Sequence, residues 1–256
     1  MQLLAHQPAA EGGRRQFEAA GTVQLPSLRG TLDLADGLDI AARNHPAFAV
    51  SGDYYDCQVT GTGEVAFTIG DVMGAGLAAA TLVTCLRSAF HAGVKRGLDL
   101  QSLDWRLNEV MQSISEAGRF ATGILGRCDL ANGVLVLTCA GHPWPSVFCG
   151  GERIPPVDAA WTLPWGLPLR RRTLRPARIR LSGRLSLLAY TDGLSELTNA
   201  CGEPYSAKRL EEYHAAHLDC TADRLCDAVL DDVLKHAGPA RPLADDMTVL
   251  AIRGTP

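Results

Sequence analysis

The chain has 256 residues, of which 46% are hydrophobic and 20% charged, with a formal net charge of −4. This composition supplies a sizeable core and is typical of one large globular domain rather than of a disordered chain, and its acidic balance does not favour nucleic acid as a partner. Because no apolar run approaches the about 20 residues that cross a bilayer, and the N-terminus lacks the charge order of a signal peptide, we expect a cytoplasmic protein without membrane association.

Residues 1–30 show weak hydrophobic periodicity and are predicted to form an N-terminal tail with a short helix near residues 14–23. The folded domain is expected over residues 31–256. Its first part, residues 38–60, contains strand-like stretches around an Asn-His-Pro turn. A Gly-Thr-Gly turn then predicts a hairpin whose second strand covers residues 64–69.

Two helices are predicted next. The first covers about twenty residues from 76 to 97 and stops at Gly97, and the second covers residues 100–117. The small residues on one face of the first helix favour core packing, with close contact to a partner or second subunit as the alternative.

The second half of the chain begins with β character and ends with helices and one strand. An Asn132-Gly133 turn and a Gly150-Gly151 turn each predict a hairpin, and an apolar strand ends at Asp192. The remaining expected elements are helices at 206–217 and 221–236 and a strand at 245–254. Such grouping of strands and helices favours an α+β fold, in which antiparallel sheets form a core covered by helices on both faces.

The eight cysteines form no CxxC pair, and several lie inside apolar runs. We therefore predict free thiols, most of them buried, rather than disulfides or a zinc site.

Several aspartates share one local context at the ends of predicted strands: Asp53, Asp71, Asp192, Asp245 and Asp246. Each lies beside an apolar segment, and no Lys or Arg is within five residues of Asp53 or Asp71. A carboxylate at the edge of a core is unfavourable unless it is paired or binds a metal ion. If the strand ends converge, all-oxygen ligands indicate Mg²⁺ or Mn²⁺ rather than Zn²⁺, whereas ordinary turn capping is the alternative for each residue alone.

The glycine-rich segment "GDVMGAG" starts at Gly70 and contains one of these aspartates. Its spacing is neither GxGxxG nor a Walker loop, and a carboxylate inside the turn would repel a pyrophosphate. The segment therefore predicts room for a divalent metal ion and a phosphate.

Five segments in order resemble the SpoIIE-like branch of the metal-dependent type-2C protein serine/threonine phosphatases, the PPM family. They are "VSGDYYD" (50–56), "IGDVMGAGLAAA" (69–80), "AGHPWP" (140–145), "LLAYTDGLSE" (187–196) and "DDMTVLAI" (245–252). The resemblance implies a four-layer α-β-β-α sandwich of two antiparallel sheets flanked by helices.

The resemblance also implies a site that binds two Mn²⁺ or Mg²⁺ ions. Asp71 would bridge both ions, with the carbonyl of Val72 beside it, and Asp53, Asp192 and Asp245 would be further ligands. These carboxylates would be catalytic through the bound metals and water. Asp56 is a weaker candidate in the first motif, and Asp246 stays open as an alternative to Asp245.

The implied reaction is in-line attack of a metal-bridging hydroxide on a protein phosphoserine or phosphothreonine. In this branch the substrate is usually a phosphorylated STAS-domain anti-sigma-factor antagonist of a partner-switching pathway. An activator or stressosome-type regulator and a homodimer stay open as further partners.

The sequence departs from the family pattern at Ala75, where many relatives carry Lys, and at Met73, where eukaryotic enzymes carry His. Loss of the Lys could lower activity if that residue orients phosphate. His142, in a Gly-Pro turn, is expected to be structural rather than catalytic. Trp161 and Trp165 are expected either to pack their loop or to form part of a partner surface.

Two other functions are weighed against the enzyme. A phosphatase-like binding module would be expected to have lost a metal aspartate, and none is missing. An interaction protein would dock acidic partners through the arginine-rich segment 169–180. The alternative for this segment is a solvated loop and edge strand. The function of an interaction protein would depend on the arginines at 170–172 and not on Asp71.

Overall fold

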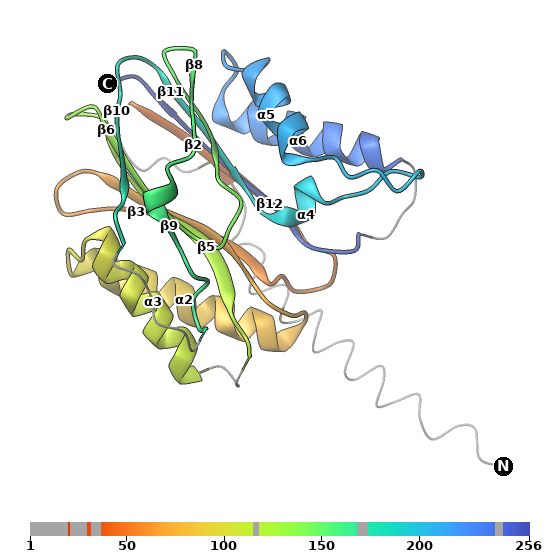
Figure 1. The fold of residues 1–256 in the computed structure, drawn as a ribbon, viewed down its shortest axis with the longest axis horizontal. Coiled ribbons are helices and arrows are strands. Elements are labelled where there is room, and N and C mark those ends of the chain that lie inside the picture. Colours follow the sequence, from red (N-terminus) through yellow and green to blue (C-terminus); the bar gives the residue numbers. More distant parts are fainter. Residues whose placement is uncertain (1–19, 21–29, 32–36, 115–117, 168–173, 239–242) are drawn as a thin grey trace.

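The computed structural model describes residues 20, 30–31, 37–114, 118–167, 174–238 and 243–256. Two β-sheets pack face to face, and helices cover the outer face of each, so that four layers are seen edge-on (Figure 1). The predicted α+β sandwich is therefore confirmed. The short helix expected near residues 14–23 lies outside the described residues, apart from Ala20.

The first sheet has the strand order β10-β6-β5-β4-β3, and all neighbours on this path are antiparallel. The expected hairpins around Gly61-Thr62-Gly63 and Asn132-Gly133 form β3–β4 and β5–β6. A short β9 lies parallel to β6 at the edge. The strands are β3 (Asp53–Val59), β4 (Val65–Val72), β5 (Ala121–Asp129), β6 (Val134–Ala140), β9 (Trp161–Thr162) and β10 (Ala177–Arg180).

The second sheet has the order β1-β2-β12-β11-β7-β8 and is antiparallel throughout. The chain's last strand, β12, therefore lies in the middle of this sheet between β2 and β11. The strands are β1 (Gly30–Thr31), β2 (Leu38–His45), β7 (Ser146–Cys149), β8 (Glu152–Ile154), β11 (Leu185–Tyr190) and β12 (Met247–Gly254).

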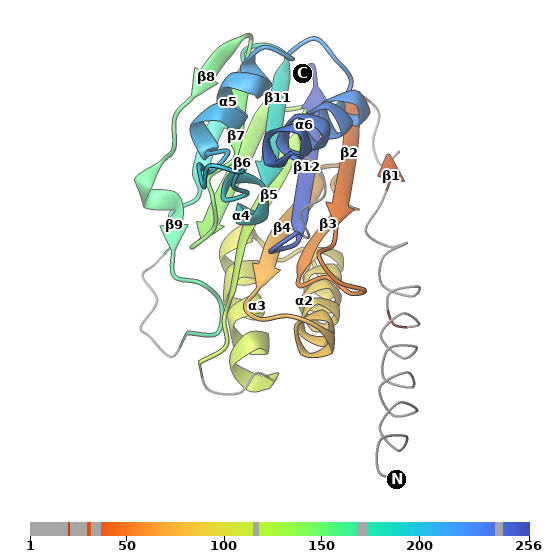
Figure 2. The same ribbon diagram turned by 90° about the vertical axis from the view of Figure 1, so that its right-hand side faces the viewer.

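Four of the helices form two pairs on opposite sides of the sandwich. Helices α2 and α3 pack on β3, β4 and β5, and helices α5 and α6 pack on the sheet that contains β12 (Figures 1 and 2). Ser206 and Thr221 cap α5 and α6 by accepting hydrogen bonds from backbone N–H groups three residues later. The helices are α2 (Leu77–Lys95), α3 (Leu100–Ile114), α4 (Asp192–Ser195), α5 (Ala207–Ala215) and α6 (Ala222–Ala237), with a 3₁₀ turn at Asp158–Ala160.

Two hydrophobic clusters hold the layers together. One fills the space between the sheets and beneath α2 and α3, and the other lies between the β12 sheet and α5 and α6. Strands β4 and β12 are almost fully buried, because apolar layers cover both of their faces. This packing holds the ends of the two strands in place.

Helix α2 is long and apolar. By length and composition alone it could cross a membrane, which differs from the expectation that no apolar run of the chain is long enough. In the fold nine of its residues are buried, including Leu86 and Phe90, and core helices commonly have this composition. The prediction of free cysteines is confirmed: all eight are free, and five of them are buried.

Candidate metal centre

Two of the predicted ligands face each other across the β3–β4 hairpin. Asp53 opens β3 and pairs in register with Asp71 at the end of β4. Directly opposed residues of an antiparallel pair place their side chains on the same face of the sheet, so the two carboxylates lie close together. Like charges in this position are unfavourable without a neutralising partner.

The other two predicted ligands come from the second sheet. Asp192 is the first residue of α4, directly after β11, and Asp245 lies in the turn that precedes β12. A Cβ on Gly193 would stand 1.9 Å from the carbonyl oxygen of Asp246, so only glycine allows α4 to approach this turn. The short α4 was not predicted, and both aspartates at 245 and 246 precede the last strand rather than lie in it.

The four carboxylates lie near enough to one another for their charges to interact. Burial, followed by the charges of Asp192 and Asp245, raises the pKa of Asp71 to about 7. Burial and then the charge of Asp71 raise the pKa of Asp53 well above its usual value. Burial also raises the pKa values of Asp192 and Asp245, with Glu196 and Asp192 as the leading charges respectively. The structure therefore brings together the carboxylates that the sequence singled out.

No Lys or Arg forms an ion pair with these four aspartates within the described part of the chain. Their mutual repulsion thus calls for a cation from outside the protein, and oxygen donors suit Mg²⁺ or Mn²⁺. Among the described residues no three Asp, Glu, His or Cys side chains are grouped as ligands of one ion. Mg²⁺ in proteins commonly takes one or two carboxylates and keeps several waters, so the donor set fits.

Asp246, the alternative to Asp245, is occupied by hydrogen bonds within the protein. Its Oδ1 accepts from the backbone N–H of Ala47 at 2.7 Å, and its Oδ2 accepts from the N–H of Gly52 at 2.7 Å and from the hydroxyl of Ser51 at 3.1 Å. Asp245 is partly exposed and, among the described residues, accepts a hydrogen bond only from the N–H of its neighbour Asp246, at 2.8 Å. The geometry favours Asp245 as the ligand and Asp246 as the residue that fixes the β2–β3 connection.

Asp53 is positioned by a threonine from the opposite sheet. The Thr191 hydroxyl donates to Asp53 Oδ2 at 2.7 Å and accepts from the Thr248 N–H at 2.9 Å. This buried contact joins the two sheets directly behind the candidate metal centre.

We expect Thr191→Val to weaken Mn²⁺ binding about tenfold or more, because an unsupported ligand loses its orientation. The measurement is isothermal titration of the metal-free protein with Mn²⁺. Thr191→Ser, which keeps the hydroxyl, should bind as the wild type does. Equal loss in the Ser and Val variants would mean that packing of the threonine methyl group matters and that the hydroxyl does not.

Two other sequence candidates lie outside the cluster. Asp56 is three residues from Asp53, an odd separation that turns its side chain to the other face of β3, where it pairs with Arg87 at 2.9 Å and His91 at 2.8 Å. His142 is buried, its Nδ1 lies 2.8 Å from the Thr122 hydroxyl, and burial lowers its pKa to about 3. Both are structural in this geometry, and His142 is uncharged at neutral pH.

The other residues noted in the sequence analysis differ in burial. Trp165 is fully buried and donates to Asp104, whereas Trp161 is partly exposed and stacks on Trp144 with ring centroids 5.9 Å apart. Met73 and Ala75 are exposed in the glycine-rich segment. In the arginine-rich segment, the arginines at 170–172 lie outside the described residues, and the described arginines at 175, 178 and 180 are exposed.

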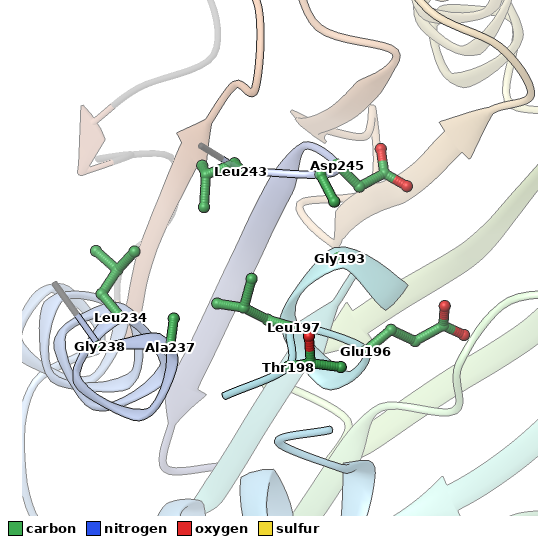
Figure 3. A pocket seen from close by; sticks show the side chains of 10 residues that line it. Gly193, Glu196, Leu197, Thr198, Leu234, Ala237, Gly238, Leu243 and Asp245 are labelled. Atoms are coloured by element: carbon green, nitrogen blue, oxygen red, sulfur yellow. The ribbon is translucent and has the colours of Figure 1, made fainter. Parts of the chain in front are cut away.

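A cavity of about 420 Å³ opens next to Asp245 (Figure 3). Leu197, Leu234 and Leu243 line one side of it, and the carboxylates of Glu196 and Asp245 extend from the other (Figure 3). The candidate metal centre therefore has an apolar recess beside it.

The sequence profile of the family described as stage II sporulation protein E (SpoIIE) matches residues 61–255. This chain belongs to the SpoIIE family. The resemblance inferred from the five motifs is thereby confirmed, and the matched segment contains three of the four predicted aspartate ligands.

Named relatives of this SpoIIE-family chain have low but extended similarity. It is 25% identical to Protein IcfG of Synechocystis over 98% of the chain and 43% of the relative, and 27% identical to phosphoserine phosphatase RsbU of Bacillus subtilis over 94% of the chain and 70% of the relative. A crystal structure of the RsbU and RsbW domains of Rv1364c from Mycobacterium tuberculosis superposes with a TM-score of 0.75 at 26% identity, covering 89% of the chain and 64% of that structure. The chain thus spans less than half of one curated relative and about two thirds of the other.

Proposed function

We propose that this chain is a metal-dependent protein serine/threonine phosphatase with two Mn²⁺ or Mg²⁺ ions at Asp53, Asp71, Asp192 and Asp245. The observation that carries the proposal is the convergence of these carboxylates, with raised pKa values, from both sheets. Membership of the SpoIIE family and similarity to a phosphoserine phosphatase support it.

The residues have distinct tasks in this proposal. Asp71 faces Asp53 and its pKa responds to the charges of Asp192 and Asp245, so it would be the carboxylate that holds both ions, and the Val72 carbonyl would be an additional oxygen donor. When bound, such a pair of ions lowers the pKa of a water molecule and neutralises the phosphate oxygens. Thr191 holds Asp53 in orientation, and Asp246 holds the β2–β3 connection against the centre.

The natural substrate that we propose is a serine-phosphorylated STAS-domain protein of a partner-switching pathway in the cytoplasm. Similarity to RsbU and to a protein that contains RsbU and RsbW domains supports this context. A stressosome-type activator and a homodimer belong to the same proposal. The binding-module alternative gains no support, because none of the four aspartates is missing from the sequence.

The proposal is tested by hydrolysis of p-nitrophenyl phosphate. We expect purified protein to hydrolyse this ester with Mn²⁺ or Mg²⁺ and to lose the activity in EDTA, because the carboxylates alone cannot neutralise a phosphate. Restoration by added Mn²⁺ separates metal removal from denaturation. A folded protein that is inactive with both metals would contradict the proposal, as would activity that persists in EDTA.

A further inference from the structure

Three large apolar side chains are exposed beside the candidate metal centre. Phe48 is 61% exposed, Met73 47% and Leu77 41%. We call these three residues the apolar rim. The described part of the chain has only five other exposed large hydrophobic residues, and they lie on other elements: Val59, Trp105, Ile114, Val157 and Trp161.

The apolar rim lies on the two chain segments that adjoin Asp53 and Asp71 in sequence. Phe48 lies in the β2–β3 connection, next to Ala47, whose N–H donates to Asp246 at 2.7 Å. Met73 follows β4, two residues after Asp71, and Leu77 begins α2. The two connections contact each other, since the Val72 N–H donates to the Gly52 carbonyl at 3.1 Å, and they lie at the same end of the sheets (Figure 2).

The rim is held in place before any partner binds. The N–H of Met73 donates to the Phe120 carbonyl at 3.0 Å, and Leu77 is fixed by the first turn of α2. Exposed apolar side chains on a fixed backbone are unfavourable in water, and burial against a partner removes that cost. Aromatic and Met side chains are also enriched in protein interfaces.

A cation lies beside the rim. The Nη1 atom of Arg119 is 3.8 Å from the place that a Cβ on Gly74 would occupy, and Arg119 forms no ion pair with any described residue. The surface next to the candidate metal centre therefore combines exposed apolar side chains with an arginine that has no ion-pair partner among the described residues. A partner that carries a phosphate group on an apolar protein surface complements both features.

We propose that the apolar rim is the surface on which the phosphoprotein substrate docks, so that Phe48, Met73 and Leu77 contribute to hydrolysis of a protein phosphoserine but not of a small phosphate ester. The inference rests on the proposed function. It follows from position: a protein whose phosphoserine reaches Asp71 covers the adjacent connections, whereas p-nitrophenyl phosphate reaches the ions without covering them.

The test compares two triple variants of the full chain. The rim variant is Phe48→Ala, Met73→Ala and Leu77→Ala, and the control variant is Val59→Ala, Trp105→Ala and Val157→Ala. Both remove three exposed apolar side chains, and Val59 lies at the end of β3 remote from Asp53. For each protein, kcat/KM is measured with Mn²⁺ on p-nitrophenyl phosphate and on serine-phosphorylated proteins, namely several STAS-domain proteins and β-casein.

We expect the rim variant to lose about tenfold or more in kcat/KM on the fastest phosphoprotein and to match the wild type on p-nitrophenyl phosphate. The control variant should match the wild type on both. Equal losses in the two variants, or no selective loss in the rim variant, would overturn the docking inference while leaving the phosphatase proposal intact.

Two further outcomes are also decisive. Wild-type protein that hydrolyses the small ester but none of the phosphoproteins would overturn the docking inference and the protein-phosphatase proposal together. If light scattering shows that the rim variant changes the oligomeric state, the rim binds a second copy of the chain, and the inference is again wrong.

Discussion

Asp71→Asn is expected to abolish metal-dependent hydrolysis and to stabilise the metal-free protein at the same time. Asp71 is the carboxylate whose pKa responds to Asp192 and Asp245 and which faces Asp53 across the hairpin. An amide in its place cannot supply negative charge to two cations, so turnover should fall by several orders of magnitude. The amide nevertheless fits the same space and removes the repulsion.

The effect on stability depends on pH. The pKa of Asp71 is about 7 in the folded protein, well above that of an unfolded aspartate, so the folded state binds more protons between about pH 4 and pH 7. The stability of the metal-free wild type should therefore fall as pH rises through this window, by up to a few kcal/mol at this site. Asp71→Asn lacks this titration and should be the more stable protein at pH 7.5.

Thermal unfolding in EDTA at pH 5 and at pH 7.5 measures this difference. The melting temperature of Asp71→Asn should exceed that of the wild type by a small amount at pH 5 and by a larger amount at pH 7.5. Mn²⁺ should raise the melting temperature of the wild type and have little effect on the variant. A variant that melts lower at both pH values would show that Asp71 stabilises the fold and does not lie in a repulsive cluster.

The adjacent aspartates at 245 and 246 are expected to give opposite results. Asp246→Ala leaves the part-buried N–H of Ala47 and the buried N–H of Gly52 without their acceptor and should destabilise the protein by about 3 kcal/mol. Asp245→Ala removes an exposed carboxylate and should leave the melting temperature unchanged or higher. It should nevertheless eliminate hydrolysis of p-nitrophenyl phosphate, because a proposed metal ligand is lost.

Urea unfolding and hydrolysis of p-nitrophenyl phosphate, measured on both variants, separate the two roles. Asp246→Asn is a useful companion, since the amide oxygen keeps one acceptor and should recover part of the stability. If Asp246→Ala unfolds at the wild-type urea concentration while Asp245→Ala does not, the two roles assigned here are reversed.

The hairpins and the capped helices could be predicted because short sequence signals determine them. Asn132-Gly133 fits a tight turn, and Ser206 and Thr221 are common helix caps. The pairing of Asp53 with Asp71 was also within reach: a hairpin centred on Thr62 places these two residues opposite each other. Likewise, because Asp56 is three residues from Asp53 on the same strand, the sequence could have assigned the two side chains to opposite faces of β3.

Other features depend on contacts between distant segments. The sequence could not choose between Asp245 and Asp246, because the choice depends on N–H groups 194 and 199 residues away in the β2–β3 connection. It also missed α4, since four residues are too few to show a helical period. The exposure of Phe48 beside the centre is equally invisible in the sequence, because periodicity does not show which connections meet.

The four carboxylates divide evenly between the sheets, with Asp53 and Asp71 on one and Asp192 and Asp245 at the end of the other. Bound ions would thus act as a cross-link between the two halves of the sandwich, and without them the like charges at these ends repel one another. Since ligand binding to the folded state adds stability that grows with the logarithm of free ligand, the divalent-ion concentration would set how strongly the two sheets are held together. Any partner that shears one sheet against the other by a small distance would then switch the site, without touching a single ligand.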